Sequence, residues 1–234
     1  MFASILRLTC ILVVCSTAIS LAETESWETL NTAGMLAYRE KDFLTAKELF
    51  ERALETLDRG SQPDPHAATT FNNLGAVHES LGEYEQAELR YRNSLAVIEM
   101  IQGPDHPDVA MGLNNLASLY FSQKAFEKAE PLWRRALEIS ERVLGDKHPH
   151  LVQPLVTLAI VSQAQRKYDQ AETFYIRAIR ITEHALNPQH PRLIPLYTRY
   201  ATLLRQANRK DEADVVERKI DSLRSTNTAV PRTP

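Results

Sequence analysis

Histidines recur at regular intervals in this chain of 234 residues and are the first candidates for chemistry. His106, His148 and His190 are 42 residues apart, and His150 adds a second imidazole beside His148. Imidazole binds zinc and transfers protons. One shared metal is excluded, however, because helix layers are about 10 Å apart whereas zinc ligands lie about 2 Å from the ion. Since a proline follows each member of the series, we expect these three histidines to cap turns and helix starts.

Carboxylates recur in the same way, and we interpret them as solvated or helix-start charges. They are Glu88, Glu130, Glu172 and Asp214. The sequence contains no Gly-x-Ser-x-Gly turn, glycine-rich phosphate loop, His-Glu-x-x-His motif or paired cysteine spacing. We therefore predict that the protein is not an enzyme and uses no cofactor and no metal.

Paired asparagines are the candidates for binding. They open the segments Asn72-Asn73-Leu74-Gly75 and Asn114-Asn115-Leu116-Ala117. An asparagine offers two donors and one acceptor, the set needed to hold the backbone of an extended peptide. The predicted peptide-binding residues are Asn72, Asn73, Asn114, Asn115, Met111, Phe121, Glu79 and Ser118. An alternative stays open, in which the amides hydrogen-bond within the protein and order one repeat on the next.

The elements that must position these residues come from a 42-residue repeat. Small residues mark it at Gly75, Ala117, Ala159 and Ala201 and again at Ala87, Ala129, Ala171 and Ala213, and aromatic residues mark it at Tyr91, Trp133 and Tyr175. An earlier copy, with Gly34 and Phe50, lies at an offset of 41. We divide residues 23–224 into repeats at about 24–64, 65–106, 107–148, 149–190 and 191–224.

Each repeat contains two helical patterns. In the third copy the first pattern has Leu113, Leu116, Ala117 and Tyr120, and the second has Phe126, Ala129, Trp133, Ala136 and Leu137. Neither apolar stripe can be buried alone, so the hairpins must stack. We predict an all-α, right-handed superhelical solenoid of about five helix-turn-helix repeats, in which Pro131 kinks its helix. The asparagines then lie on the inner side of the first helices.

The pattern resembles the tetratricopeptide repeat, and the longer period resembles its kinesin light chain subclass. The third copy carries the small and aromatic positions as Leu116, Ala117, Tyr120, Ala129, Trp133 and Ala136, together with the segment Gly145-Asp146-Lys147-His148-Pro149. The resemblance implies a protein-binding solenoid in which asparagines of the Asn-Asn-Leu-Ala segment clamp a peptide. The fifth copy departs from it at Glu217, which is typical of a polar terminal cap.

Composition excludes further classes. The formal charge is −3, with 24% charged residues of both signs, so a nucleic acid is not expected as a partner. Only 7 glycines and 7% aromatic residues favour a helical chain over a sandwich or barrel.

The first 22 residues are typical of a cleavable export signal. Arg7 precedes a short apolar run, and Ser20-Leu21-Ala22 supplies small residues before Glu23. The predicted location is therefore the periplasm or the medium, with no membrane span left after cleavage. An uncleaved anchor or a lipid on Cys15 are alternatives, although the run is shorter than the roughly 20 residues of a span. Residues 225–234 are predicted to form a flexible tail.

These observations favour an exported, non-catalytic scaffold that binds extended segments of a partner protein. The alternative is a structural protein that self-associates or braces an envelope complex.

Overall fold

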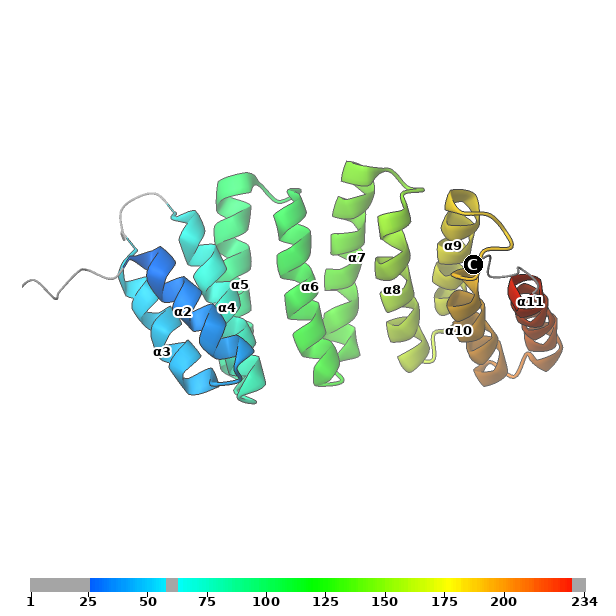
Figure 1. The fold of residues 1–234 in the computed structure, drawn as a ribbon, viewed down its shortest axis with the longest axis horizontal. Helices are drawn as coiled ribbons and strands as arrows, with labels where there is room; N and C mark the ends of the chain where they lie inside the picture. Colours follow the sequence, from blue (N-terminus) through cyan, green and yellow to red (C-terminus); the bar gives the residue numbers. More distant parts are fainter. Residues whose placement is uncertain (1–25, 58–62, 229–234) are drawn as a thin grey trace, which may run out of the picture. The chain divides into compact units, whose positions relative to one another are not determined.

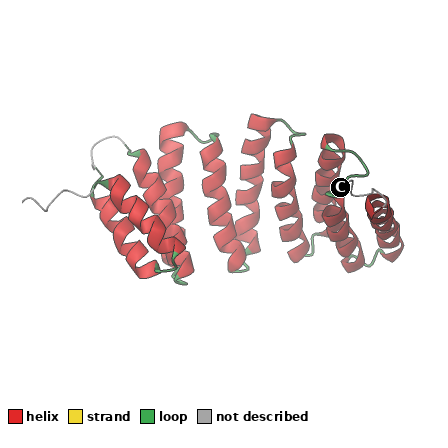
Figure 2. Cartoon of the chain, in the orientation of Figure 1, coloured by secondary structure: helices red, strands yellow, loops and turns green. Residues whose placement is uncertain are grey.

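The computed structural model describes residues 26–57 and 63–228, and all regular structure in these residues is helical (Figure 2). The predicted export signal, with Cys10 and Cys15, lies outside the described residues. The chain divides into two compact units, residues 1–97 and 98–234. No described helix has the length and apolar character that a membrane crossing requires.

The first unit contains the helices α2 (Trp27–Arg39), α3 (Phe43–Glu55) and α4 (Pro65–Ser80), and α5 (Tyr84–Gln102) begins in it (Figure 1). The second unit contains α6 (Pro107–Ser122), α7 (Phe126–Leu144), a 3-10 turn (Pro149–Leu151), α8 (Val152–Ala164), α9 (Tyr168–Ala185), α10 (Leu193–Gln206) and α11 (Lys210–Thr228). Helices that follow one another pair as hairpins, for example α2 with α3 and α6 with α7. The predicted all-α chain of five helix-turn-helix repeats is confirmed.

The turn inside each hairpin is built around one residue with positive φ. These residues are Lys41, Gly82, Lys124, Arg166 and Asn208, with φ between 59° and 76°. Glycine adopts this left-handed conformation without steric cost, whereas other residues do so rarely. The same conformation recurs at lysine, arginine and asparagine, which differ in their side chains. We therefore infer that the packing of the two helices determines the turn.

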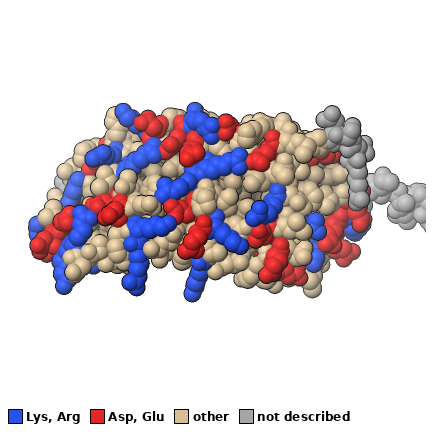
Figure 3. Space-filling model, turned by 180° about the vertical axis from the view of Figure 1, so that it is seen from behind, with Lys and Arg blue, Asp and Glu red and all other residues tan. Residues whose placement is uncertain are grey.

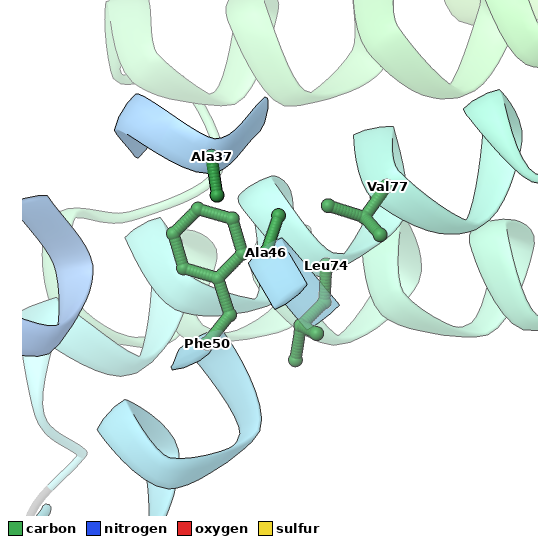
Figure 4. Packing of buried hydrophobic residues seen from close by; sticks show 5 residues of the cluster. All are labelled: Ala37, Ala46, Phe50, Leu74 and Val77. Atoms are coloured by element: carbon green, nitrogen blue, oxygen red, sulfur yellow. The ribbon is translucent and has the colours of Figure 1, made fainter. Parts of the chain in front are cut away.

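The core of the first unit lies between α2, α3 and α4. Phe50, with 1% exposure, is surrounded by Ala37, Ala46, Leu74 and Val77 (Figure 4). A Cβ atom built on Gly34 would lie 2.7 Å from Cε1 of Phe50. The small residues of the repeat are therefore required by the close approach of an aromatic ring from the second helix.

The second unit buries the predicted stripes of α6 and α7. Leu113, Leu116, Ala117 and Tyr120 are each no more than 3% exposed, and Trp133 of α7 is 8% exposed. Pro131 lies inside α7, which continues as one helix to Leu144.

Ion pairs connect the second helices of successive repeats in the second unit. Their partners are 36 residues apart and are Glu99 with Arg135, Glu141 with Arg177, and Glu183 with Lys219. On the face shown in Figure 3, basic and acidic groups are interspersed. Much of the charge in this unit therefore holds repeats together.

The C-terminal boundary differs from the prediction. α11 extends to Thr228, four residues into the segment 225–234 that was expected to be a tail. The apolar pattern ends at Leu223, which is 1% exposed, but backbone hydrogen bonding needs no apolar side chain and the next proline is Pro231. In α10, Arg205 pairs with Glu217, so a polar contact stands where the aromatic residue of other repeats would be.

Candidate functional site

The recurrent histidines cap helix starts at His106 and His148 and the turn before α10 at His190, as predicted. Nδ1 accepts a hydrogen bond from the backbone N–H two residues later, at 3.2 Å for His106, 3.2 Å for His148 and 3.1 Å for His190. Asp64 makes the same contact at 2.8 Å in the preceding repeat. Among the described residues, no group of three or more His, Cys, Asp or Glu side chains could hold a metal ion.

Four predicted binding residues of the second unit lie along one face of α6, at spacings of three or four residues. Met111 is 61% exposed, Ser118 is exposed, and Asn114 between them is half-buried. Phe121 is half-buried because its ring contacts Trp133, with ring centroids 5.6 Å apart. This face of α6 therefore presents a thioether, an amide and a hydroxyl group, together with the half-buried ring of Phe121.

The neighbouring amide, Asn115, is also half-buried, as is Asn72 in the first unit. The prediction that both contact a peptide stays a prediction.

Two predicted residues of the first unit bind other side chains of the protein. Asn73 Nδ2 donates to Asn31 Oδ1 of the preceding repeat at 2.9 Å. Glu79 accepts a hydrogen bond from Tyr91 Oη at 3.0 Å. Burial raises the pKa of Tyr91, and the negative charge of Glu79 raises it further. Asn73 therefore makes a hydrogen bond between repeats, which is the alternative role predicted for these amides.

Two hollows of the second unit lie elsewhere, between the fourth and fifth repeats. The larger one, the α8–α10 hollow, has a volume of about 540 Å³. It is lined mainly by aliphatic side chains of three helices, including Val152, Val156, Ile160, Ala185, Leu186 and Leu196. Cavities of this size accommodate ligands in other proteins.

A smaller hollow of about 400 Å³ continues along the same two helices. Ile160 and Arg199 line both hollows. Its polar wall is a relay in which Tyr175 Oη donates to Gln163 Oε1 at 3.2 Å and Gln163 Nε2 donates to Gln206 Oε1 at 2.7 Å. Together the hollows form one continuous surface of mixed character on α8 and α10.

This surface is not among the binding residues predicted from the sequence. The predicted site follows the asparagines and ends where Val156 and Thr157 replace them. The missed signal was the appearance of aliphatic residues, Val156 and Ile160, at inner positions that are polar in the third copy.

The interpretation of Glu130 as a solvated charge was wrong. Glu130 is 8% exposed, and its carboxylate accepts hydrogen bonds from Arg134 in its own helix and from Gln165 and Lys167 in the next repeat. Burial opposes ionisation, but these three donors outweigh it and lower the pKa of Glu130 to about 2. Glu172 repeats the arrangement with Arg209, at 2.6 Å.

This carboxylate makes stability depend on pH. Because the folded pKa of Glu130 lies below its ordinary value of 4.5, its stabilisation is complete above pH 4.5 and is lost as the pH falls towards 2. We expect the free energy of unfolding to decrease over that range by about 2–3 kcal/mol more in the wild type than in Glu130→Gln. Urea unfolding at a series of pH values tests this, with the exposed Glu138→Gln as control. Parallel curves for wild type and Glu130→Gln would contradict it.

Matches to the tetratricopeptide repeat family cover residues 27–97, 66–132, 108–161 and 152–216. No curated protein matches the sequence.

Solved structures with the same fold include kinesin light chain-like proteins. BtubC (BKLC) from P. vanneervenii is 20% identical, with 88% of this chain and 83% of that chain covered and a TM-score of 0.71. A structure of kinesin light chain TPR-like repeats from Podospora anserina is 16% identical to this chain, with 87% of this chain and 97% of that chain covered and a TM-score of 0.72. PilF of Pseudomonas aeruginosa is 21% identical, with 84% and 75% covered and a TM-score of 0.56. At these identities the similarity shows the fold alone.

Proposed function

Because the chain belongs to the tetratricopeptide repeat family, whose members bind protein partners, we propose that it is a scaffold for protein–protein interaction. Its second unit binds an extended segment of a partner protein along α6, α8 and α10 and catalyses no reaction. Export by the segment 1–22 is part of the proposal and predicts Glu23 as the first residue of the mature protein.

The observation that carries the proposal is the continuous hollow surface on α8 and α10. Its aliphatic part buries apolar side chains, and its glutamines and two threonines offer hydrogen bonds to a peptide backbone. On α6, Met111 and Ser118 are exposed and the Asn114 amide lies between them. Such a surface fits an extended peptide whose apolar side chains contact the aliphatic part and whose backbone groups bind the polar side chains. Since ordering a flexible segment costs entropy, we expect micromolar affinity.

Crosslinking in the exported fraction identifies the bound segment, which is then synthesised and titrated against the purified protein. We expect the variant Asn114→Ala/Ile160→Ala to bind this peptide at least about tenfold more weakly, a loss of about 1.4 kcal/mol. Thr173→Ala, on the exposed face of α9, is the control. Circular dichroism verifies that helical content is retained. An unchanged Kd in the double variant would remove α6 and α8 from the binding surface.

Self-association remains the second candidate, because the first repeat exposes aliphatic side chains. Leu36 of α2 is 56% exposed and Leu44 of α3 is 71% exposed. Light scattering of the mature chain distinguishes the two: a concentration-independent monomer excludes self-assembly, whereas a dimer that Leu36→Ser/Leu44→Ser dissociates supports it.

A further inference from the structure

The α8–α10 hollow combines an aliphatic floor with one sign of charge. Its aliphatic lining comes from α8, the end of α9 and the first half of α10. The charged residues that line it are Arg192 and Arg199, and no Asp or Glu lines either this hollow or the smaller one beside it. The two arginines are seven residues apart. Arg192 is the residue directly before α10 and has helical backbone angles, and Arg199 lies within α10, so the two lie on the same side of the helix axis.

These arginines differ from most others in the second unit. Arg134 is held by Glu130 of its own helix, and Arg177 and Arg209 are each held by a glutamate of the preceding repeat. Among the described residues, neither Arg192 nor Arg199 has an ion pair, and both are exposed. Their guanidinium groups therefore face solvent with their capacity for bidentate carboxylate binding unused.

We propose that this hollow selects partner segments in which aliphatic side chains lie next to an acidic residue. The aliphatic groups occupy the floor formed by Val156, Ile160 and Leu196, and the carboxylate binds Arg199, with Arg192 two turns away extending the positive rim. This inference rests on the proposed function and deepens it, because it names the chemistry of the segment that the groove prefers.

The observations favour a peptide over other anions. A single-stranded nucleic acid is typically bound by aromatic side chains on which its bases stack, and the lining of the larger hollow contains none. A small inorganic anion would leave the aliphatic floor exposed to water. An acidic and aliphatic peptide satisfies both parts, and burial of each CH₂ group contributes about 0.8 kcal/mol.

The test uses the full-length mature protein and two fluorescent nine-residue probes of sequence Gly-Ser-Leu-Asp-Leu-Asp-Leu-Ser-Gly, with either aspartates or asparagines at the two acidic positions. Fluorescence anisotropy gives the affinity for each. We expect the aspartate probe to bind at least tenfold more tightly at low salt, because only a carboxylate pairs with guanidinium. Arg192→Gln/Arg199→Gln removes this preference without weakening the asparagine probe. Arg218→Gln, an equal change of charge on the exposed side of α11, leaves the preference intact.

A second variant separates the floor from the rim. Ile160→Ala shortens an aliphatic side chain that lines both hollows and leaves both arginines unchanged, so we expect both probes to bind more weakly while the preference for aspartate is retained. Equal binding of the two probes, or a preference that survives loss of both arginines, overturns acidic selection. If the segment identified by crosslinking still requires Asn114 and Ile160 in that case, the proposed function stands while this inference fails.

Discussion

Replacing Phe50 by alanine is expected to reduce the free energy of unfolding by about 3–5 kcal/mol, the range for truncation of a buried aromatic side chain. Phe50 is 1% exposed and contacts residues of α2, α3 and α4 in one cluster. The ring also fills the space left by Gly34, with Cε1 2.7 Å from where a Cβ would stand. Alanine would leave a cavity at the place where the ring now packs against Gly34 of the other helix.

Urea unfolding followed by circular dichroism measures the loss, and hydrogen exchange locates it in the first unit. Leu44→Ala is the matched control, since it removes an aliphatic side chain from the same helix at a position that is 71% exposed. We expect that change to cost less than about 0.5 kcal/mol. If the two variants were equally stable, Phe50 would not be a core residue.

The second large effect is a gain of stability from Pro131→Ala. Pro131 is exposed, so little packing is lost, and it lies inside a helix that runs from Phe126 to Leu144. Proline costs a helix interior about 3 kcal/mol relative to alanine, because it lacks the N–H and its ring meets the preceding turn. The unfolded chain regains up to about 1 kcal/mol of conformational entropy. We therefore expect a net stabilisation of about 2 kcal/mol.

Pro107→Ala is the control for this substitution. Pro107 is at the first position of α6, where a missing N–H costs nothing and the fixed φ favours the helix. Its replacement should leave stability unchanged or lower it slightly. A destabilised Pro131→Ala would mean that the proline ring has a packing role that its exposure does not suggest.

Local features were predictable because they depend on residues close in sequence. The helices of the third repeat begin and end as the pattern of Leu116, Ala129 and Trp133 indicates. The histidine caps followed from a proline after each of them, since a cap needs only the backbone two residues later. The tail was misplaced by four residues because apolar periodicity reports burial and not backbone hydrogen bonding.

Partners from different repeats were not predictable. Asn73 was predicted to bind a peptide or to order neighbouring repeats, without a named partner, and Glu130 was interpreted as a solvated charge. In the structure Asn73 binds Asn31, and Glu130 binds Gln165 and Lys167. Which neighbour a polar side chain meets depends on distances between helices that are some 40 residues apart. A repeat pattern predicts that helices of successive repeats are neighbours, but it does not predict which of their side-chain atoms are in contact.

The sequence by itself determined the helical class, the number of hairpins, the small and aromatic residues at their crossings and the capped helix starts, since helical periodicity and capping are local. Only the tertiary structure decided where the surface is hollow and which arginines are left without a carboxylate. Those properties arise from the spacing between α8 and α10 and from competition among charged groups of different repeats, which only the folded arrangement resolves.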